Sequence, residues 1–143
     1  MRIHQISVFL ENRAGQLAEI TRLLAQNHVD IRALSIAETA DYGVARLIVD
    51  DSQKASAILL EHGDILSMNP VWAVEVPDRP AGLSDLLTVL ADAHVDVEYM
   101  YALVTRKDGC AYMILRISDE DAFCAALANK DIRIVDGSEL GLK

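Results

Sequence analysis

The sequence has few of the residues that mark secreted, zinc-binding or nucleic-acid-binding proteins. Its only cysteines are Cys110 and Cys124, and they form no CxxC pair, which argues against a disulfide framework and a zinc motif. Lysine and arginine number 13 against 22 aspartates and glutamates, so the net charge is −9. The basic footprint required by a phosphate backbone is therefore missing, and attachment to an anionic membrane surface is disfavoured.

Long hydrophobic runs are missing as well. No stretch reaches the roughly 18 apolar residues of a membrane-spanning helix. The opening MRIHQISVFL alternates like a strand and lacks the unbroken apolar core of a signal peptide. Hydrophobic residues nevertheless make up 52% of the chain, enough to form a core. We therefore predict a soluble, cytoplasmic protein that binds neither membrane nor nucleic acid.

Motifs for catalysis and cofactor binding are also absent. The sequence contains no P-loop, GxGxxG, GxSxG or HExxH pattern, and the four histidines do not have the spacing of metal ligands. No nucleophile is paired with a base in any recognisable pattern. We predict a protein that is not an enzyme, with no catalytic residues, no cofactor and no metal.

An internal repeat dominates what is present. QNHVDIRAL (26–34) returns as DAHVDVEYM (92–100), so that His28 and His94 are 66 positions apart (94 − 28). The same offset pairs Arg13 with Arg79 and relates the flanking sequence without a gap. Asn-Pro in SMNPV marks a break between the copies. The sequence predicts two domains, residues 1–68 and 69–143.

Each copy has the hydrophobic pattern of a small α+β unit. Alternating strands flank a helical segment, a Gly-containing hairpin follows, and a second helix and a short strand close the copy. We expect Asn12 and Asp78 to cap the first helix of each copy, and Ser52 and Ser118 the second. The order predicts two ferredoxin-like βαββαβ units in tandem, with antiparallel sheets and helices on one face.

Strand alternation places Tyr99, Tyr101 and Tyr112 together on the sheet face without helices. So apolar a face is expected to be covered, either by the other repeat or by a partner chain. We therefore predict that these tyrosines lie at an interface and that the protein is a homodimer. Contact between one of them and a ligand at that junction is the alternative.

The first strand–helix loop of each copy has the features of an anion cradle. The first-turn N–H groups of a helix lack intrahelical partners, and the helix dipole places partial positive charge there. Gly15 and Gly82 reduce side-chain bulk beside these donors, and Arg13 and Arg79 add a cation. A capped helix with a solvated arginine would explain the same residues without any ligand.

ENRAGQLAEITRLLAQNHVDI and PDRPAGLSDLLTVLADAHVDV resemble the opening of ACT domains. The resemblance covers essentially the whole chain as a tandem pair, and it implies a regulatory module that holds an amino acid or similar carboxylate between domains. Ala14 replaces the family's usual proline, and Ala81 shifts the second loop's register. The ligand-binding positions implied in the first loop and second strand are Asn12, Arg13, Ala14, Gly15, Gln16, Leu17 and Ile31, and Asp78, Arg79, Pro80, Ala81, Gly82, Leu83 and Val97.

Three other functions fit parts of the sequence. An ACT-type assembly subunit would bind a protein partner, for example a regulated enzyme, without any ligand. An RNA-binding module would stack bases on the sheet tyrosines, but the acidic charge opposes this. An acylphosphatase-like enzyme would use an arginine of the first loop, but the glycine-rich loop of that family is missing.

Overall fold

The structure, a computed structural model, describes residues 2–11, 13–38, 41–104 and 107–143. The chain forms two compact units. The N-terminal unit comprises His4–Asn69 with Gly141–Lys143, and the C-terminal unit comprises Pro70–Leu140 with the residues before His4. The short terminal segments thus group with the opposite repeat, and the boundaries 1–68 and 69–143 stay a prediction. A hydrogen bond from the Lys143 N–H to the Asp50 carbonyl, at 2.8 Å, joins the C-terminal segment to the N-terminal unit.

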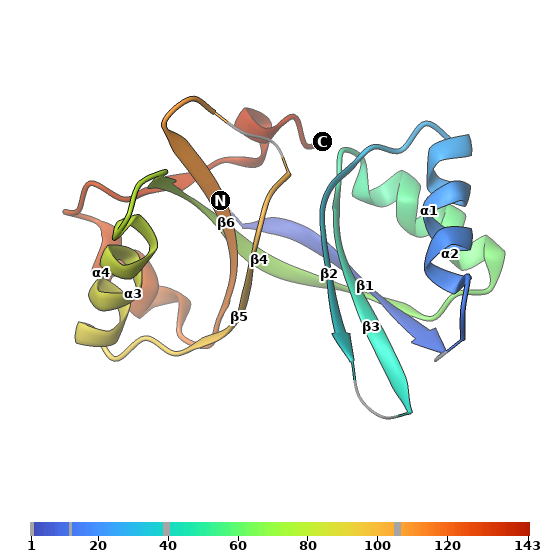
Figure 1. The fold of residues 1–143 in the computed structure, drawn as a ribbon, viewed down its shortest axis with the longest axis horizontal. Coiled ribbons are helices and arrows are strands. Elements are labelled where there is room, and N and C mark those ends of the chain that lie inside the picture. Colours follow the sequence, from blue (N-terminus) through green and yellow to red (C-terminus); the bar gives the residue numbers. More distant parts are fainter. Residues whose placement is uncertain (1, 12, 39–40, 105–106) are drawn as a thin grey trace. The chain divides into compact units, whose positions relative to one another are not determined.

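The N-terminal unit follows the predicted βαββαβ order (Figure 1). Its central strand β1 pairs antiparallel with β3, and β3 pairs antiparallel with β2. Residues Val8 and Leu10 of β1 therefore lie opposite Ala45 and Gly43 of β3. The elements are β1 (Ile3–Glu11), α1 (Gln16–Gln26), β2 (Ile31–Glu38), β3 (Tyr42–Val49), α2 (Ser52–His62) and the first part of β4 (Leu66–Pro77).

The C-terminal unit repeats this order from the second part of β4. Strand β6 pairs antiparallel with both β4 and β5, and β7 pairs with β4 on its other side. The prediction of two α+β units with antiparallel sheets is therefore confirmed. The remaining elements are α3 (Gly82–Asp92), β5 (Val97–Ala102), β6 (Cys110–Ile117), α4 (Glu120–Leu127), β7 (Arg133–Val135) and a 3-10 helix (Gly137–Leu140).

Each unit has its own core between two helices and one face of its sheet. In the N-terminal unit Ile20, Leu24 and Leu59 from the helices are fully buried against Val8 and Leu47. In the C-terminal unit Leu86 and Phe123 pack with Trp72 and Leu115, and the Trp72 and Phe123 rings lie 5.4 Å apart. Burial of each such side chain contributes about 1.5–3 kcal/mol, so the helix-facing stripes hold the units together.

The repeat extends to unusual backbone conformations. His28 and His94 both adopt the left-handed region, with φ of 60° and 57°. Each ends a helix in the same way, because the following Val29 and Val95 N–H groups donate to the Leu24 and Leu90 carbonyls at 2.9 Å. Non-glycine residues rarely adopt this conformation. Its recurrence 66 residues later indicates that the HVD corner is a conserved feature of the duplicated unit's geometry.

The predicted caps of α2 and α4 are wrong by one residue. Asp51 caps α2, because its carboxylate accepts from the Lys54 N–H at 3.1 Å, and Asp119 caps α4 by accepting from Ala122 at 3.0 Å. Both aspartates have extended backbones, as an N-cap requires. Ser52 instead lies inside α2, and Ser118 precedes the cap of α4.

The predicted cap of α3 also needs correction. The cap positions are Gly15 and Ala81, both left-handed, and neither helix has a side-chain cap among the described residues. Asp78 is too far before α3, and its N–H donates to the Gly109 carbonyl at 2.9 Å. Asn12 lies outside the described residues. The first turns of α1 and α3 therefore keep backbone donors that no described side chain caps.

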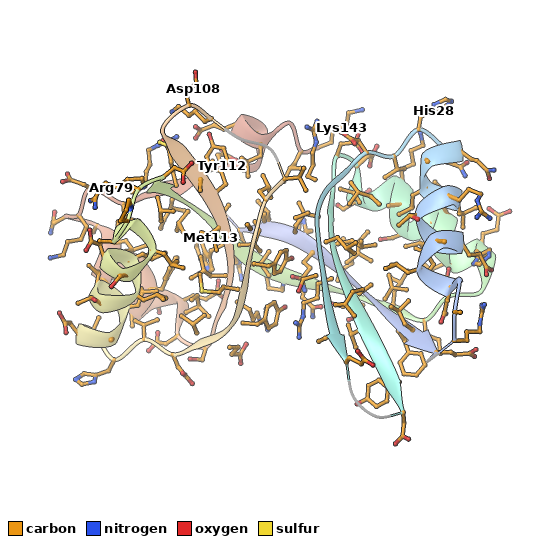
Figure 2. The ribbon with its side chains drawn as sticks, in the orientation of Figure 1. His28, Arg79, Asp108, Tyr112, Met113 and Lys143 are labelled. Carbon is orange, nitrogen blue, oxygen red and sulfur yellow. The ribbon has the colours of Figure 1, made fainter. Side chains whose placement is uncertain are left out.

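The register confirms the face on which the tyrosines lie. Tyr99 pairs with Arg116 and Tyr101 with Ile114, whereas Met100 pairs with the core residue Leu115. On β6, Tyr112 is buried and precedes the core-facing Met113 (Figure 2). The Tyr99 and Tyr101 rings stack with centroids 6.4 Å apart and remain partly exposed. Their role at an interface stays a prediction.

Candidate functional site

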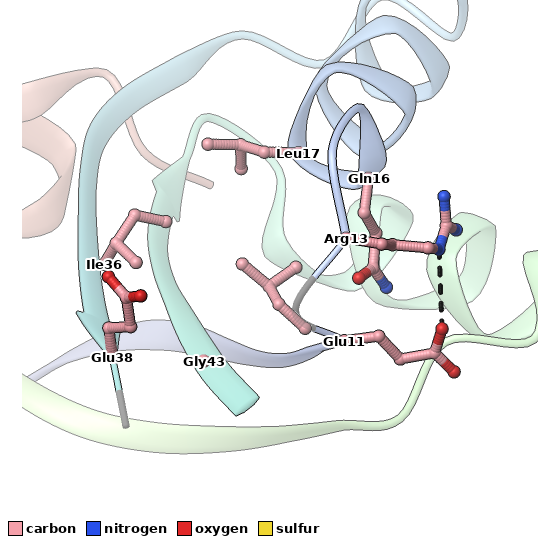
Figure 3. Close-up of a pocket in the computed structure, with 8 residues that line it drawn as sticks. Glu11, Arg13, Gln16, Leu17, Ile36, Glu38 and Gly43 are labelled. Atoms are coloured by element: carbon pink, nitrogen blue, oxygen red, sulfur yellow. Dashed lines mark ion pairs between the residues drawn. The ribbon is translucent and has the colours of Figure 1, made fainter. Parts of the chain in front are cut away.

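A pocket opens in the N-terminal unit where β1 ends, α1 begins and β2 ends (Figure 3). Its volume is about 190 Å³, and it is partly open to solvent. We call it the loop pocket. It combines an apolar wall with charged and amide side chains, and the residues that line it are Leu10, Glu11, Arg13, Gln16, Leu17, Ile36, Glu38 and Gly43.

The loop reverses the chain tightly between β1 and α1. The Arg13 N–H donates to the Glu11 carbonyl at 2.9 Å, and the Glu19 N–H donates to the Gly15 carbonyl at 2.9 Å. Gly15 has a φ of +88°, a conformation that side-chain-bearing residues rarely adopt. Open space surrounds it, since a Cβ there would meet nothing within 4 Å. Backbone conformation, rather than crowding, is thus what favours glycine here.

The apolar wall of the loop pocket comes from three elements. Leu10 of β1 is buried, Leu17 of α1 is partly buried, and Ile36 of β2 is 44% exposed. Figure 3 shows Ile36 and Glu38 on β2 facing Leu17 on α1 across the opening. An aliphatic group would replace water against this wall with a favourable free energy.

The arginine of the loop is already paired. Arg13 Nε lies 3.4 Å from Glu11 Oε2, and Arg13 Nη2 lies 3.3 Å from Glu19 Oε2 (Figure 3 marks the first pair). The expected free cation for an anionic ligand is therefore shared between two carboxylates. An incoming carboxylate has to compete with these residues or to use the backbone donors of α1.

Two side chains of the loop pocket carry oxygens that have no partner in the described part of the chain. Gln16 Oε1 is buried and accepts no hydrogen bond within the described part of the chain. Glu38 forms no ion pair with any described residue. Both are acceptors, so this side of the pocket is complementary to a hydrogen-bond donor or a cation.

Glu19, the partner of Arg13, also contacts His62 at the end of α2. Glu19 Oε1 lies 3.2 Å from His62 Nε2, and His62 Nδ1 lies 2.8 Å from Asp64 Oδ2. The hydrogen bond to Asp64 raises the pKa of His62, followed by the negative charges of Asp64 and Glu19. A protonated His62 can donate to both carboxylates, whereas the neutral ring has only one N–H to donate.

The second loop keeps the scaffold but differs at the helix start. Arg79 Nη2 lies 3.2 Å from Asp85 Oδ2, matching the Arg13–Glu19 pair six residues apart. Ala81 takes the left-handed position of Gly15, with a φ of 73°. A Cβ on Gly82 would lie 2.1 Å from the Pro77 carbonyl oxygen, so α3 begins directly against the end of its strand. That position admits no side chain.

The structure separates the other predicted positions from the loops. Strands β1 and β2 both run antiparallel to β3, so they are parallel to each other. Ile31, opposite Val49, thus lies at the far end of the sheet from Glu11, opposite Tyr42. Val97 begins β5 in the same way.

The other predicted positions divide into pocket residues and exposed residues. Arg13, Gln16 and Leu17 line the loop pocket. The exposed positions are Ala14, Pro80 and Ala81 in the loops, and Leu83, which is 42% exposed.

Five residues of the loop pocket escaped the sequence analysis. They are Leu10, Glu11, Ile36, Glu38 and Gly43. The position of Ile36 and Glu38 could have been predicted from the order of the elements. A βαβ crossover makes β1 and β2 parallel, and this brings the end of β2 beside the loop.

A second charged cluster lies in the C-terminal unit. Glu75 is largely buried between Arg133 and Lys107, and Lys107 Nζ lies 3.3 Å from Glu75 Oε1. A hydrogen bond from Cys110, followed by those from Arg133 and Lys107, lowers the pKa of Glu75 to about 2. Arg133 Nη1 also lies 2.7 Å from Glu139 Oε2. The cluster ties the 3-10 helix to the sheet.

The described residues were also searched for metal sites and for membrane-spanning helices. Among the described residues, no group of three or more histidines, cysteines, aspartates and glutamates is arranged to hold a metal ion. No helix in the same part of the chain has the length and apolarity needed to cross a membrane.

Comparisons with known proteins agree with this architecture. The family model for the ACT domain pair matches residues 1–141. The crystal structure of protein BT0572 from Bacteroides thetaiotaomicron is similar with a TM-score of 0.90 and 33% sequence identity, covering 99% of this chain and 96% of that one. No curated protein matches the sequence.

More distant structural neighbours are regulatory subunits. Those of aspartate kinase from Thermus thermophilus and Thermus flavus have TM-scores of 0.64 and 0.58. Each is 15% identical and covers 87% of this chain and 90% of its own. At this identity the similarity shows the fold alone.

Proposed function

We propose, on the premise that this chain belongs to the ACT domain pair family, that it is a non-catalytic regulatory protein that binds an amino acid. The ligand would lie at an interface between ACT units, held by the first strand–helix loop and the start of a second strand. We further propose a cytoplasmic homodimer that acts on a regulated enzyme.

The loop pocket is the observation that carries this proposal. Its mouth lies at the start of α1, where no described side chain caps the first-turn N–H groups. These donors suit a carboxylate. Glu38, which forms no ion pair with any described residue, suits a cationic group, and Leu10, Leu17 and Ile36 suit an aliphatic side chain.

The separation of Ile31 from the loop supports a ligand between units. Within one unit these positions lie at opposite ends of the strands, so one small molecule cannot touch both. A ligand held by a loop and a strand start must therefore take them from two units, either of one chain or of two copies. A homodimer would supply such a pairing.

A thermal-shift screen with the twenty amino acids tests the proposal. A ligand that binds the native state stabilises it and so raises the melting temperature. At a ligand concentration a hundred times the Kd, the free energy of unfolding increases by about 2.7 kcal/mol. We expect at least one amino acid to do so. Ile36→Trp should remove the shift by filling the loop pocket, whereas the matched Leu60→Trp, at an exposed aliphatic residue of α2, should retain it. The proposal fails if no amino acid shifts the melting temperature.

An assembly subunit without a ligand is the second candidate. Strand β2 lies at a sheet edge, where Leu34 and Ile36 are 39% and 44% exposed. An exposed apolar edge is a surface on which a partner strand can add. Stable association with an enzyme in the absence of any stabilising amino acid, measured by size-exclusion chromatography with light scattering, would favour this candidate.

A further inference from the structure

We infer that the loop pocket selects amino acids whose side chain ends in a cationic group. The inference rests on the proposed function and adds the charge of the ligand. It starts from the charges of the described residues in and around the pocket. Glu11, Glu38 and Arg13 line it, and Glu19 contacts Arg13 from outside.

The charge balance of this group is negative. Three carboxylates and one guanidinium give a net charge of −2 (1 − 3). Arg13 is divided between Glu11 and Glu19, so Glu38 remains without a compensating cation among the described residues. A zwitterionic amino acid leaves the balance at −2, a basic one reduces it to −1, and an acidic one increases it to −3. Coulomb interactions therefore favour the basic ligand.

The shape of the pocket assigns each part of such a ligand a place, and the start of a second strand from another ACT unit would cover its open side. The α-carboxylate would meet the start of α1, which no described side chain caps, beside Gln16 and Leu17. Gln16 Oε1 is enclosed and lacks a partner in the described structure, so its amide would turn toward the pocket to accept from the α-ammonium. The methylene chain would cross the Leu10–Leu17–Ile36 wall, and the terminal cation would reach Glu38 on β2, the strand that faces α1 in Figure 3.

The second repeat lacks these acceptors. At the offset of 66, Glu11 and Gln16 correspond to Pro77 and Gly82, and Glu38 corresponds to the exposed Val104. The scaffold of the loop is therefore present twice, whereas the acceptors are present once. The preference for a cation is accordingly a property of the N-terminal unit.

Calorimetric titration of the full chain with lysine, norleucine and glutamate tests this inference. Lysine and norleucine differ mainly in the terminal ammonium group. We expect lysine to bind at least tenfold more tightly than norleucine at low salt, glutamate to bind more weakly than either, and the lysine preference to shrink as salt screens the charges.

The variant Glu38→Gln keeps the size of the side chain and removes its charge. We expect it to reduce the lysine-to-norleucine affinity ratio to threefold or less, whereas Glu61→Gln, a matched change on an exposed residue of α2, should leave the ratio unchanged. Equal affinities for lysine and norleucine in the unmodified chain would overturn the inference and leave the proposed function standing. Binding of no amino acid at all would overturn both.

Discussion

The two strand–helix loops of this protein share a scaffold but differ in the space they enclose. Each has an arginine paired with an acid six residues later, and each places a left-handed residue before its helix. In the N-terminal unit the helix starts with Gln16 beside an open pocket, whereas Gly82 starts the equivalent helix against the Pro77 carbonyl. The duplicated residues maintain the fold, and the residues that differ decide whether a ligand has room.

Exchanging the residues at these helix starts would have the largest effect. We expect Gly82→Gln to destabilise the protein by about 2–4 kcal/mol, because its Cβ would lie 2.1 Å from a backbone oxygen and α3 would have to move. The reverse change, Gln16→Gly, should cost about 1 kcal/mol or less. Urea denaturation measures both, and a Gly82→Gln protein as stable as Gln16→Gly would show that the close approach is unimportant.

Removing the paired arginines should separate stability from binding. Arg13→Ala and Arg79→Ala each break ion pairs of half-exposed side chains, so we expect a loss of about 0.2–1 kcal/mol from either change. Only Arg13 lines the loop pocket. The ligand-induced rise in melting temperature should therefore change for Arg13→Ala alone, and for a basic amino acid it should grow, because the charge around the loop pocket becomes more negative. An equal change for Arg79→Ala would place a ligand in both loops.

The smallest expected effect is a pH dependence confined to the N-terminal unit. The pKa of His62 is raised in the folded protein, so its stabilisation is complete below the unfolded value of 6.5 and disappears as the pH rises through the folded pKa. The variant His62→Gln should lose more stability at pH 5.5 than at pH 8.5. Urea titrations at the two pH values check this, and a larger loss at pH 8.5 would contradict it.

The sequence predicted the caps of α2 and α4 less well than the helices themselves. Ser52 and Asp51 are both good cap types, as are Ser118 and Asp119, so composition cannot separate neighbours. The choice depends on which residue has an extended backbone and a carboxylate within reach of the N–H three positions later. The cap positions of α1 and α3 are a left-handed Gly15 and Ala81, and at α3 the expected Asp78 lies too far before the helix.

The sequence by itself determined the duplication, the order of elements in each unit and the face of the sheet on which the tyrosines lie. These follow from local patterns, namely a 66-residue offset and the periods of helices and strands. Tertiary structure decided the lining of the loop pocket, because pairing through β3 brings Ile36 and Glu38 beside Gln16 and sends Ile31 to the other end. It also decided that Arg13 is shared by Glu11 and Glu19, since that depends on where side chains meet rather than on their order along the chain.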